Sequence, residues 1–253
     1  MRSNTYTLIF TSITTIVLGF LLSFVSTSLK ETQEINEEID IMKNILYSLE
    51  FSEKDDPWTV EEVKKIFDSS VIQKVVSVDG EIIDNLVPSE IPSDKMETQF
   101  PLYIKIVNNS VDGYAIPIAG KGLWSTLYGY FALENDGSTV KGIRFYKHKE
   151  TPGLGGEVDK YWFTNNFVGK KITDKNGLLV SIQSVKGQVD SSSPDSYHQV
   201  DGISGATMTT KGLNEFLMND LKKYDSYFQK IRMRSKSYCH YLIVNLEKLI
   251  KIH

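Results

Sequence analysis

The chain has 253 residues, with 28 Lys and Arg against 32 Asp and Glu, which gives a formal net charge of −4 at pH 7. The basic residues are dispersed until the C-terminal tail, so no basic face and no nucleic-acid partner is predicted. A single cysteine excludes an intramolecular disulfide and an iron–sulfur site ligated by this chain alone, and four histidines without ligand spacing predict no metal site.

The N-terminal segment, residues 1–29, predicts a transmembrane anchor. No charged side chain occurs from Ser3 to Leu29, and Leu, Ile, Val and Phe form the majority of residues 6–25. About 20 such residues span a bilayer as a helix. The alternative is a cleaved signal peptide, but the stretch exceeds an apolar signal region of about 7–15 residues. Arg2 before the helix favours a cytoplasmic N-terminus, and hence a single-pass protein whose C-terminal domain is extracytoplasmic.

Residues 30–99 are predicted to form a juxtamembrane helical and linking region. An amphipathic helix is expected over 30–49, because apolar residues recur there at alternating spacings of four and three: Ile35, Ile39, Met42, Leu46 and Leu49. Thr59 and Glu62 then have the spacing of a capping box for a short helix that ends near Phe67.

Beyond this region the pattern changes to that of strands. Strands are predicted over 71–78, 102–107, 127–133, 140–146 and 178–185, loops over 84–100 and 187–200, and a short helix over 161–168. The third and fourth strands flank Asn135-Asp136-Gly137, which is typical of a hairpin. The expected fold class is therefore α+β: an N-terminal transmembrane helix, then a twisted, mainly antiparallel sheet with flanking helices.

Two glycine-rich segments accompany these strands. Residues 120–130 read as a flexible loop that carries Trp124 and leads into a strand. Residues 142–157 pass from an alternating strand pattern into Glu-Thr-Pro-Gly-Leu-Gly-Gly-Glu, which has the character of a ligand loop at a sheet edge. The simpler alternative is that Pro152-Gly153 is only a turn.

The sequence Asp-Gly-Ile-Ser-Gly-Ala-Thr at 201–207 is the most informative motif. Its two glycines let backbone approach a ligand closely. A helix is predicted after it, capped by Thr209 or Thr210, from the spacing of Leu213, Phe216, Leu217 and Leu221. The free N–H groups at the start of that helix favour an anion such as phosphate, and the Thr207 hydroxyl could carry it covalently. Ordinary capping by Ser, Thr and Gly is the alternative.

Together these three segments resemble the FMN-binding domain shared by the C subunit of the sodium-translocating NADH:quinone reductase and the G subunit of the related ferredoxin-linked complex. The resemblance covers roughly residues 100–225 and the N-terminal membrane helix, and it implies an FMN-binding domain at 100–228. It further implies that a dedicated flavin transferase attaches FMN through a phosphoester to Thr207, within a motif that includes Ser204, Gly205 and Ala206.

The resemblance also implies contacts to the flavin ring. Thr151 and Leu154 would pack against the isoalloxazine, with Glu150 near its polar edge, and Gly155 and Trp124 complete the expected set of cofactor contacts. The role implied is a relay of electrons between neighbouring membrane subunits, which couples NADH-to-quinone electron transfer to sodium export. No catalytic residue is assigned. The chain lacks a G-x-G-x-x-G fingerprint and is not expected to oxidise NADH alone.

Three alternatives stay open. Residues 120–129 and Gly155-Gly156-Glu157 are closer to the C subunit than to the G subunit, yet the G subunit remains the runner-up. A binding module without redox chemistry is a second possibility. A hydrolase that uses Ser204 or Thr207 with His198 is a third, although no G-x-S-x-G elbow occurs.

The last segment, residues 229–253, is a basic extension beyond the pattern of the family. Two interpretations are open: an appendage that faces the membrane or a partner, or a lineage-specific extension with no role in electron transfer.

Overall fold

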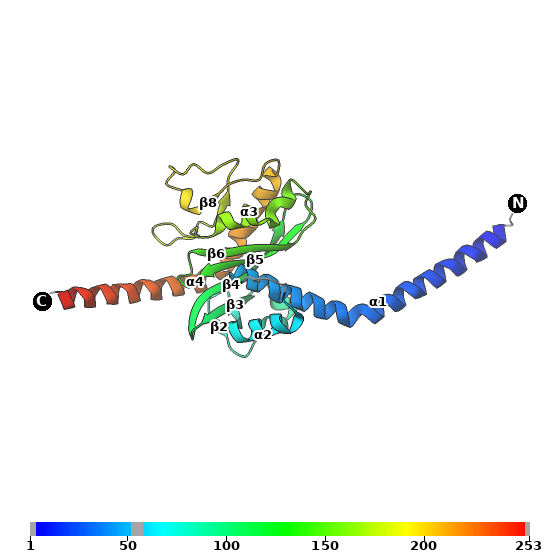
Figure 1. Ribbon diagram of the computed structural model, residues 1–253, viewed down its shortest axis with the longest axis horizontal. Coiled ribbons are helices and arrows are strands. Elements are labelled where there is room, and N and C mark those ends of the chain that lie inside the picture. The colour runs from blue at the N-terminus through cyan, green and yellow to red at the C-terminus, as the bar shows by residue number, and fades with distance from the viewer. Residues whose placement is uncertain (1–3, 52–57, 251–253) are drawn as a thin grey trace. The chain divides into compact units, whose positions relative to one another are not determined.

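The computed structural model describes residues 4–51 and 58–250 and divides into two units, Met1–Met42 and Lys43–His253 (Figure 1). Arg2, on which the predicted orientation rests, and residues 251–253 of the predicted extension lie outside the described residues. The first unit consists of the greater part of helix α1 (Asn4–Ser48), and the second contains the rest of α1 and all other elements.

Helix α1 joins the predicted anchor and the predicted amphipathic helix in one element. No proline interrupts the 45 residues from Asn4 to Ser48, so nothing in the backbone ends the helix near residue 30. Its apolar side chains are exposed in the first part, for example Phe20 at 69% and Leu22 at 72%. By length and composition α1 can cross a membrane, a test that a signal sequence near an N-terminus also passes.

The second unit is built on a six-stranded sheet in the order β2-β1-β3-β4-β5-β6, with every neighbouring pair antiparallel. Its strands are β1 (Val71–Ser77), β2 (Ile82–Ile83), β3 (Gln99–Val107), β4 (Ser110–Lys121), β5 (Thr126–Glu134) and β6 (Val140–Lys147). The predicted α+β class with an antiparallel sheet is thereby confirmed. The segment 142–157 runs out of β6 at one edge of the sheet, as expected.

The predicted hairpin is formed by β5 and β6. Asp136 Oδ1 accepts hydrogen bonds from the backbone N–H groups of Ser138 and Thr139, both at 2.8 Å, and Gly137 takes a φ of 65°. An Asp side chain that accepts hydrogen bonds from backbone N–H groups two or three residues later stabilises a turn.

Strand β4 was not predicted, although it pairs with both β3 and β5. Glycine and proline at positions 113, 117 and 120 hide its strand pattern. Pro117 faces Tyr130 of β5, at a point where β4 has already separated from β3, whose register with it covers β4 residues 110–115. Proline has no backbone N–H, and it is tolerated at this position because β4 pairs with a neighbouring strand on one side only.

The predicted strand over 178–185 is largely wrong. Only β7 (Gln183–Ser184) is a strand, paired in parallel with β8 (Gln199–Val200), and Leu179 makes a single bridge to Thr173. Ser181 adopts a φ of 63°, and the N–H groups of Val180 and Ser181 both reach the carbonyl of Ile172. This turn interrupts the extended backbone. The loop predicted at 84–100 contains the single turns η1 (Pro88–Glu90) and η2 (Ser93–Lys95), and that at 187–200 contains η5 (Ser196–His198) and β8.

The short helices agree with prediction. Helix α2 (Val60–Ser70) begins with the expected capping box, in which Glu62 Oε2 accepts from Thr59 N at 2.8 Å and Thr59 Oγ1 accepts from Glu62 N at 3.3 Å. The predicted helix over 161–168 appears as α3 (Tyr161–Thr164) followed by η4 (Asn165–Phe167), after the turn η3 (Gly155–Asp159).

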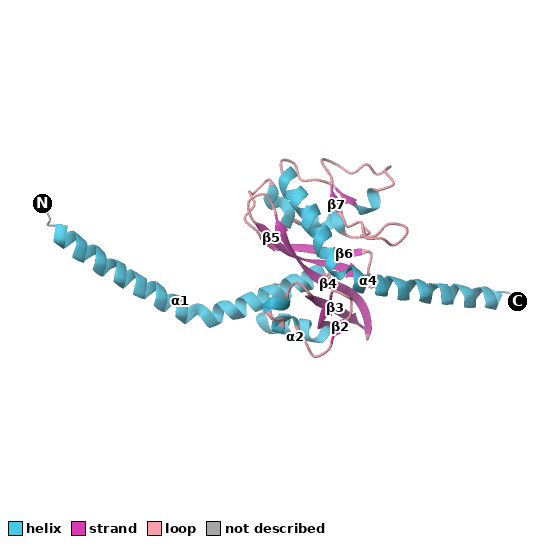
Figure 2. Cartoon of the chain, turned by 180° about the vertical axis from the view of Figure 1, so that it is seen from behind, coloured by secondary structure: helices cyan, strands magenta, loops and turns pink. Residues whose placement is uncertain are grey.

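The first part of helix α4 (Thr207–Ile250) lies across one face of the sheet (Figure 2). Leu213, Leu217 and Leu221, all on the predicted apolar stripe, are at most 1% exposed. Aromatic contacts continue the packing, because Phe100 meets Tyr224 with ring centroids 5.5 Å apart. The helix starts two residues before the predicted cap at Thr209 and continues through the predicted division at residue 228.

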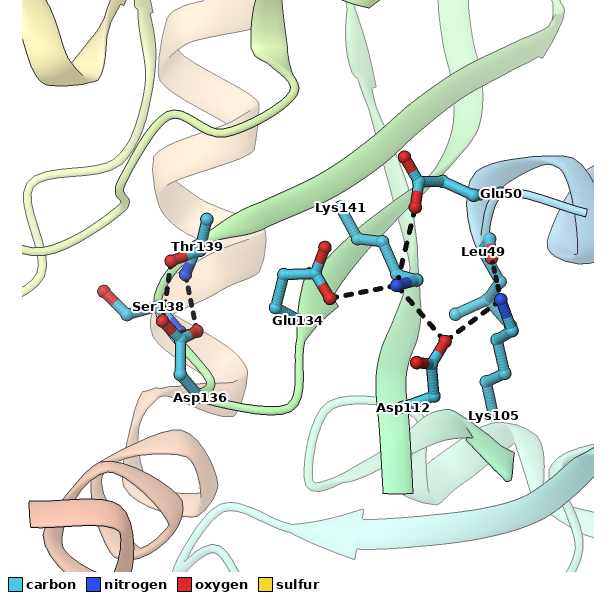
Figure 3. A network of polar contacts seen from close by, with 9 residues as sticks. All are labelled: Leu49, Glu50, Lys105, Asp112, Glu134, Asp136, Ser138, Thr139 and Lys141. Atoms are coloured by element: carbon cyan, nitrogen blue, oxygen red, sulfur yellow. Dashed lines mark hydrogen bonds and ion pairs between the residues drawn. The ribbon is translucent and has the colours of Figure 1, made fainter. Parts of the chain in front are cut away.

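A cluster of charges joins the end of α1 to the sheet (Figure 3). Lys141 of β6 is 5% exposed, and its Nζ lies 2.9 Å from Glu134 Oε2, 3.2 Å from Asp112 Oδ2 and 3.5 Å from Glu50 Oε2. Burial alone would lower the pKa of Lys141, but the carboxylates of Glu134 and Asp112 outweigh it and raise this pKa above its usual value. Lys105 Nζ extends the cluster, 3.0 Å from Asp112 and 2.9 Å from the carbonyl of Leu49.

Candidate functional site

The carboxylate of Glu150 connects the three segments that the sequence singled out. Its Oε1 accepts hydrogen bonds from the N–H groups of Trp124 and Ser125, both at 2.9 Å. Its Oε2 accepts from Leu123 N at 3.2 Å and from the hydroxyl of Thr209, in the first turn of α4, at 2.8 Å. The loop after β4, the loop after β6 and the start of α4 therefore meet at one side chain.

Glu150 is held in its ionised form, although the residue is only 5% exposed. Burial by itself would raise its pKa. The hydrogen bonds from Ser125 N, the Thr209 hydroxyl, Trp124 N and Leu123 N outweigh burial and keep the pKa of Glu150 below its usual value.

Glycines make room for this carboxylate. A Cβ at Gly122 would lie 2.8 Å from Glu150 Oε1. A Cβ at Gly155 would lie 2.8 Å from Glu150 Oε2 and would also collide with Thr209 Oγ1. Gly122 and Gly155 are thus required by close approach to the Glu150 carboxylate.

The motif at 201–207 forms a tight turn that leads into α4. Asp201 Oδ1 accepts from Val189 N at 2.8 Å, and Gly202 N donates to the carbonyl of Gly187 at 2.7 Å. Gly205 has a φ of 73°, and a Cβ there would lie 2.6 Å from Leu154 Cδ2. Leu154 of the loop after β6 therefore contacts the motif directly, and the Thr207 side chain is exposed at the first residue of the helix.

A pocket of about 750 Å³ opens beside Thr207. Besides Ser204, Gly205 and Thr207, it is lined by two lysines, Lys186 and Lys211, and by the Trp162 side chain. The remaining lining comes mainly from residues 184–188 and 201–203. An exposed hydroxyl at a helix N-terminus, close-packed glycines and two lysines form a donor set that suits a phosphate-bearing ligand.

The predicted site residues occupy three different positions. Ser204, Gly205 and Thr207 line the pocket, and Ala206 is buried beneath them at 3% exposure. Thr151, Leu154 and Trp124 lie on exposed loops, with Trp124 at 72% exposure. Glu150 and Gly155 lie inside, against Thr209.

Several residues of the site were not predicted as site residues. Trp162, Lys186 and Lys211 line the pocket, and Asn214 fixes its floor through paired hydrogen bonds with the backbone of Ser184, at 2.8 and 3.0 Å. None of these positions belongs to a motif. A lysine just after a predicted strand, or a lysine or an asparagine on a predicted helix, carries no signal of its own.

His198, the base that a hydrolase reading requires, is not one of the described residues that line this pocket. Its ring packs against Tyr197, with centroids 4.6 Å apart, and the residue is 9% exposed. The geometry offers no pairing of His198 with the hydroxyls of Ser204 or Thr207 among the described residues.

Known proteins match the chain over this site and beyond it. The family model of the FMN-binding domain matches residues 122–222. The C subunit of the Na(+)-translocating NADH-quinone reductase of Pseudomonas aeruginosa is 35% identical over 256 residues, which cover 91% of this chain and 97% of the relative.

Solved structures agree with that match. The crystal structure of the C subunit from Parabacteroides distasonis is 31% identical, with a TM-score of 0.68 over 79% of this chain and 96% of that chain. Shewanella oneidensis NqrC, at 24% identity, shares the fold with a TM-score of 0.63 over 80% of this chain and 99% of that chain. The predicted resemblance is thereby confirmed, and the chain belongs to the family formed by the C subunits of Na(+)-translocating NADH-quinone reductases.

Proposed function

We propose that this chain is the flavin-carrying electron-relay subunit of a sodium-translocating NADH:quinone reductase, with FMN bound covalently through a phosphoester to Thr207. Family membership supports the complex, and one observation supports the attachment. Thr207 presents an exposed hydroxyl at the first residue of the 44-residue helix α4, beside a pocket lined by two lysines.

The residues around Thr207 are suited to a phosphodiester. A single negative charge at a helix N-terminus gains about 0.3–1 kcal/mol from the helix dipole. Lys186 and Lys211 supply positive charge to the lining of the pocket, while Asp201 Oδ1 accepts a hydrogen bond from Val189 N. A covalent bond to Thr207 prevents loss of the flavin by dissociation at any dilution.

The exposed loops are suited to the ring. Leu154 is 43% exposed and Trp124 is 72% exposed, and both belong to loops that are tied to the start of α4. A planar aromatic ligand would cover such apolar surface. FMN supplies the electron-transfer chemistry, and Thr151, Leu154 and Trp124 orient it and exclude water. The expected position of Glu150 near the polar edge of the ring stays a prediction.

The partners follow from the same assignment. Helix α1 anchors the chain in the bacterial inner membrane, and the domain lies on the extracytoplasmic side. NADH oxidation, quinone reduction and sodium passage belong to the other polypeptides of the complex, with which this chain exchanges electrons. A flavin transferase completes its maturation.

The test is Thr207→Val in cells that contain an active flavin transferase. The wild-type protein should gain the mass of FMN less one water on the peptide that contains Thr207, and the variant should gain none while its far-UV circular dichroism is unchanged. Ser204→Ala is the matched control for the neighbouring hydroxyl, and its flavin should map to Thr207. An unmodified wild-type mass, with the transferase active on another substrate, would refute the proposal, as would flavin on Ser204.

A further inference from the structure

We infer that Glu150 is a positioning residue, which locks the loop 122–125 to the start of α4 and so sets where Trp124 stands relative to Thr207. This inference rests on the proposed function for its consequence, but its geometry belongs to the protein alone. Glu150 is buried, and its carboxylate receives five donors from two segments that are distant in sequence.

The capacity of the carboxylate is fully used within the protein. An ionised carboxylate has about four lone-pair sites. Trp124 N, Ser125 N and, at 3.4 Å, the Ser125 hydroxyl donate to Oε1, and Leu123 N and the Thr209 hydroxyl donate to Oε2. No site is left for a ring N–H of a flavin. Glu150 therefore acts on a ligand through the groups that it holds and not through a hydrogen bond of its own.

Glu150 connects the loop that carries Trp124 to the helix turn that begins with the attachment residue. Trp124 donates its backbone N–H to Glu150 and exposes its side chain. Thr209 lies two residues after Thr207 on α4. A second link reinforces the connection between the loops, because the Ser125 hydroxyl accepts from Lys149 N at 2.7 Å. The indole is thus carried on a loop whose backbone is fixed to the first turn of the helix.

Three variants separate this role from a general effect on folding. Glu150→Gln replaces an acceptor oxygen by an amide, Thr209→Val removes only the hydroxyl donor, and Thr209→Ser restores it. Glu62→Gln is the matched control, because Glu62 also accepts hydrogen bonds from the backbone and hydroxyl of one residue, Thr59, in the remote capping box of α2.

The first readout needs no flavin. In the Thr207→Val protein, loss of hydrogen bonds to a charged acceptor should speed amide hydrogen exchange at 123–125 by roughly tenfold or more in Glu150→Gln. Thr209→Val should act in the same direction, while Thr209→Ser and Glu62→Gln should match the parent. Unchanged exchange at 123–125 in Glu150→Gln would overturn the inference.

The second readout uses the flavin-loaded protein at equal occupancy, checked by intact mass. Because a nearby indole quenches an excited flavin, Glu150→Gln should increase flavin fluorescence, and Trp124→Phe should abolish the difference between Glu and Gln at position 150. An undiminished difference in the Trp124→Phe background would refute the positioning of Trp124. A wild-type protein without flavin would refute the proposed function, and with it the consequence for Trp124, while the exchange data would still decide whether Glu150 fixes the loop.

Discussion

Substitution Gly212→Ala tests how closely α4 approaches the sheet next to the site. A Cβ at Gly212 would collide with the carbonyl oxygen of Lys121 and lie 3.2 Å from its carbon and 3.4 Å from Gly122 Cα. Every obstacle is backbone, so no flexible side chain can move aside. Helix α4 or the end of β4 must shift instead.

The magnitude follows from two opposing effects. Alanine improves helix propensity by about 1 kcal/mol relative to glycine. Forced overpacking costs typically 1–3 kcal/mol, and a backbone obstacle places this case at the upper end. The expected net loss is about 1–2 kcal/mol, which for a domain of this size lowers the melting temperature by roughly 2–8 °C.

The assay is thermal unfolding followed by circular dichroism. Asn219→Ala is the matched control, because Asn219 is exposed on the same helix and gains propensity without a collision, up to about 0.7 kcal/mol. The reasoning is refuted if Gly212→Ala melts at or above the wild-type temperature, as the propensity effect alone would predict.

Two further predictions concern charge. Lys141→Met removes the buried partner of Glu134 and leaves Asp112 paired with Lys105 alone, and it should lower the free energy of unfolding by about 1–3 kcal/mol; a wild-type urea midpoint would contradict this. Because the folded protein holds the pKa of Glu150 below its usual value of 4.5, its stabilisation is present in full above that value and is lost as the pH falls through the folded pKa. The difference in urea stability between wild type and Glu150→Gln should therefore be larger at pH 7 than at pH 3.5, and a difference that does not shrink in acid would contradict the assignment.

Local signals made part of the fold predictable. The hairpin at Asp136-Gly137 and the capping box of Thr59 and Glu62 depend on residues two or three positions apart, so their sequence is sufficient. Strand β4 depends on pairing with β3 and β5, and its glycines and Pro117 conceal it. The strand prediction over 178–185 failed because Ser181 adopts a positive φ, which the identity of a serine does not indicate.

In the candidate site, too, the local features were predictable and the long-range contacts were not. The turn before Thr207 is local, and its glycines and hydroxyls are legible in the sequence. The partners of Glu150 are mainly backbone N–H groups of 123–125, which every non-proline residue possesses and no motif records. Threonine is a common helix-capping residue, and Thr209 was predicted in that role. Its hydrogen bond to Glu150, 59 positions away, could therefore not be predicted from the sequence.

That separation has a consequence for the order in which the protein matures. During synthesis Glu150 leaves the ribosome 59 residues ahead of Thr209, and its link to Trp124 already closes a loop of 26 residues. Contacts between distant segments form late, because the entropy of closing the intervening chain opposes them until most of the fold is in place. The loops beside Thr207 therefore reach their final arrangement only when α4 has docked on the sheet, which makes a completed flavin environment a marker that the whole domain has folded.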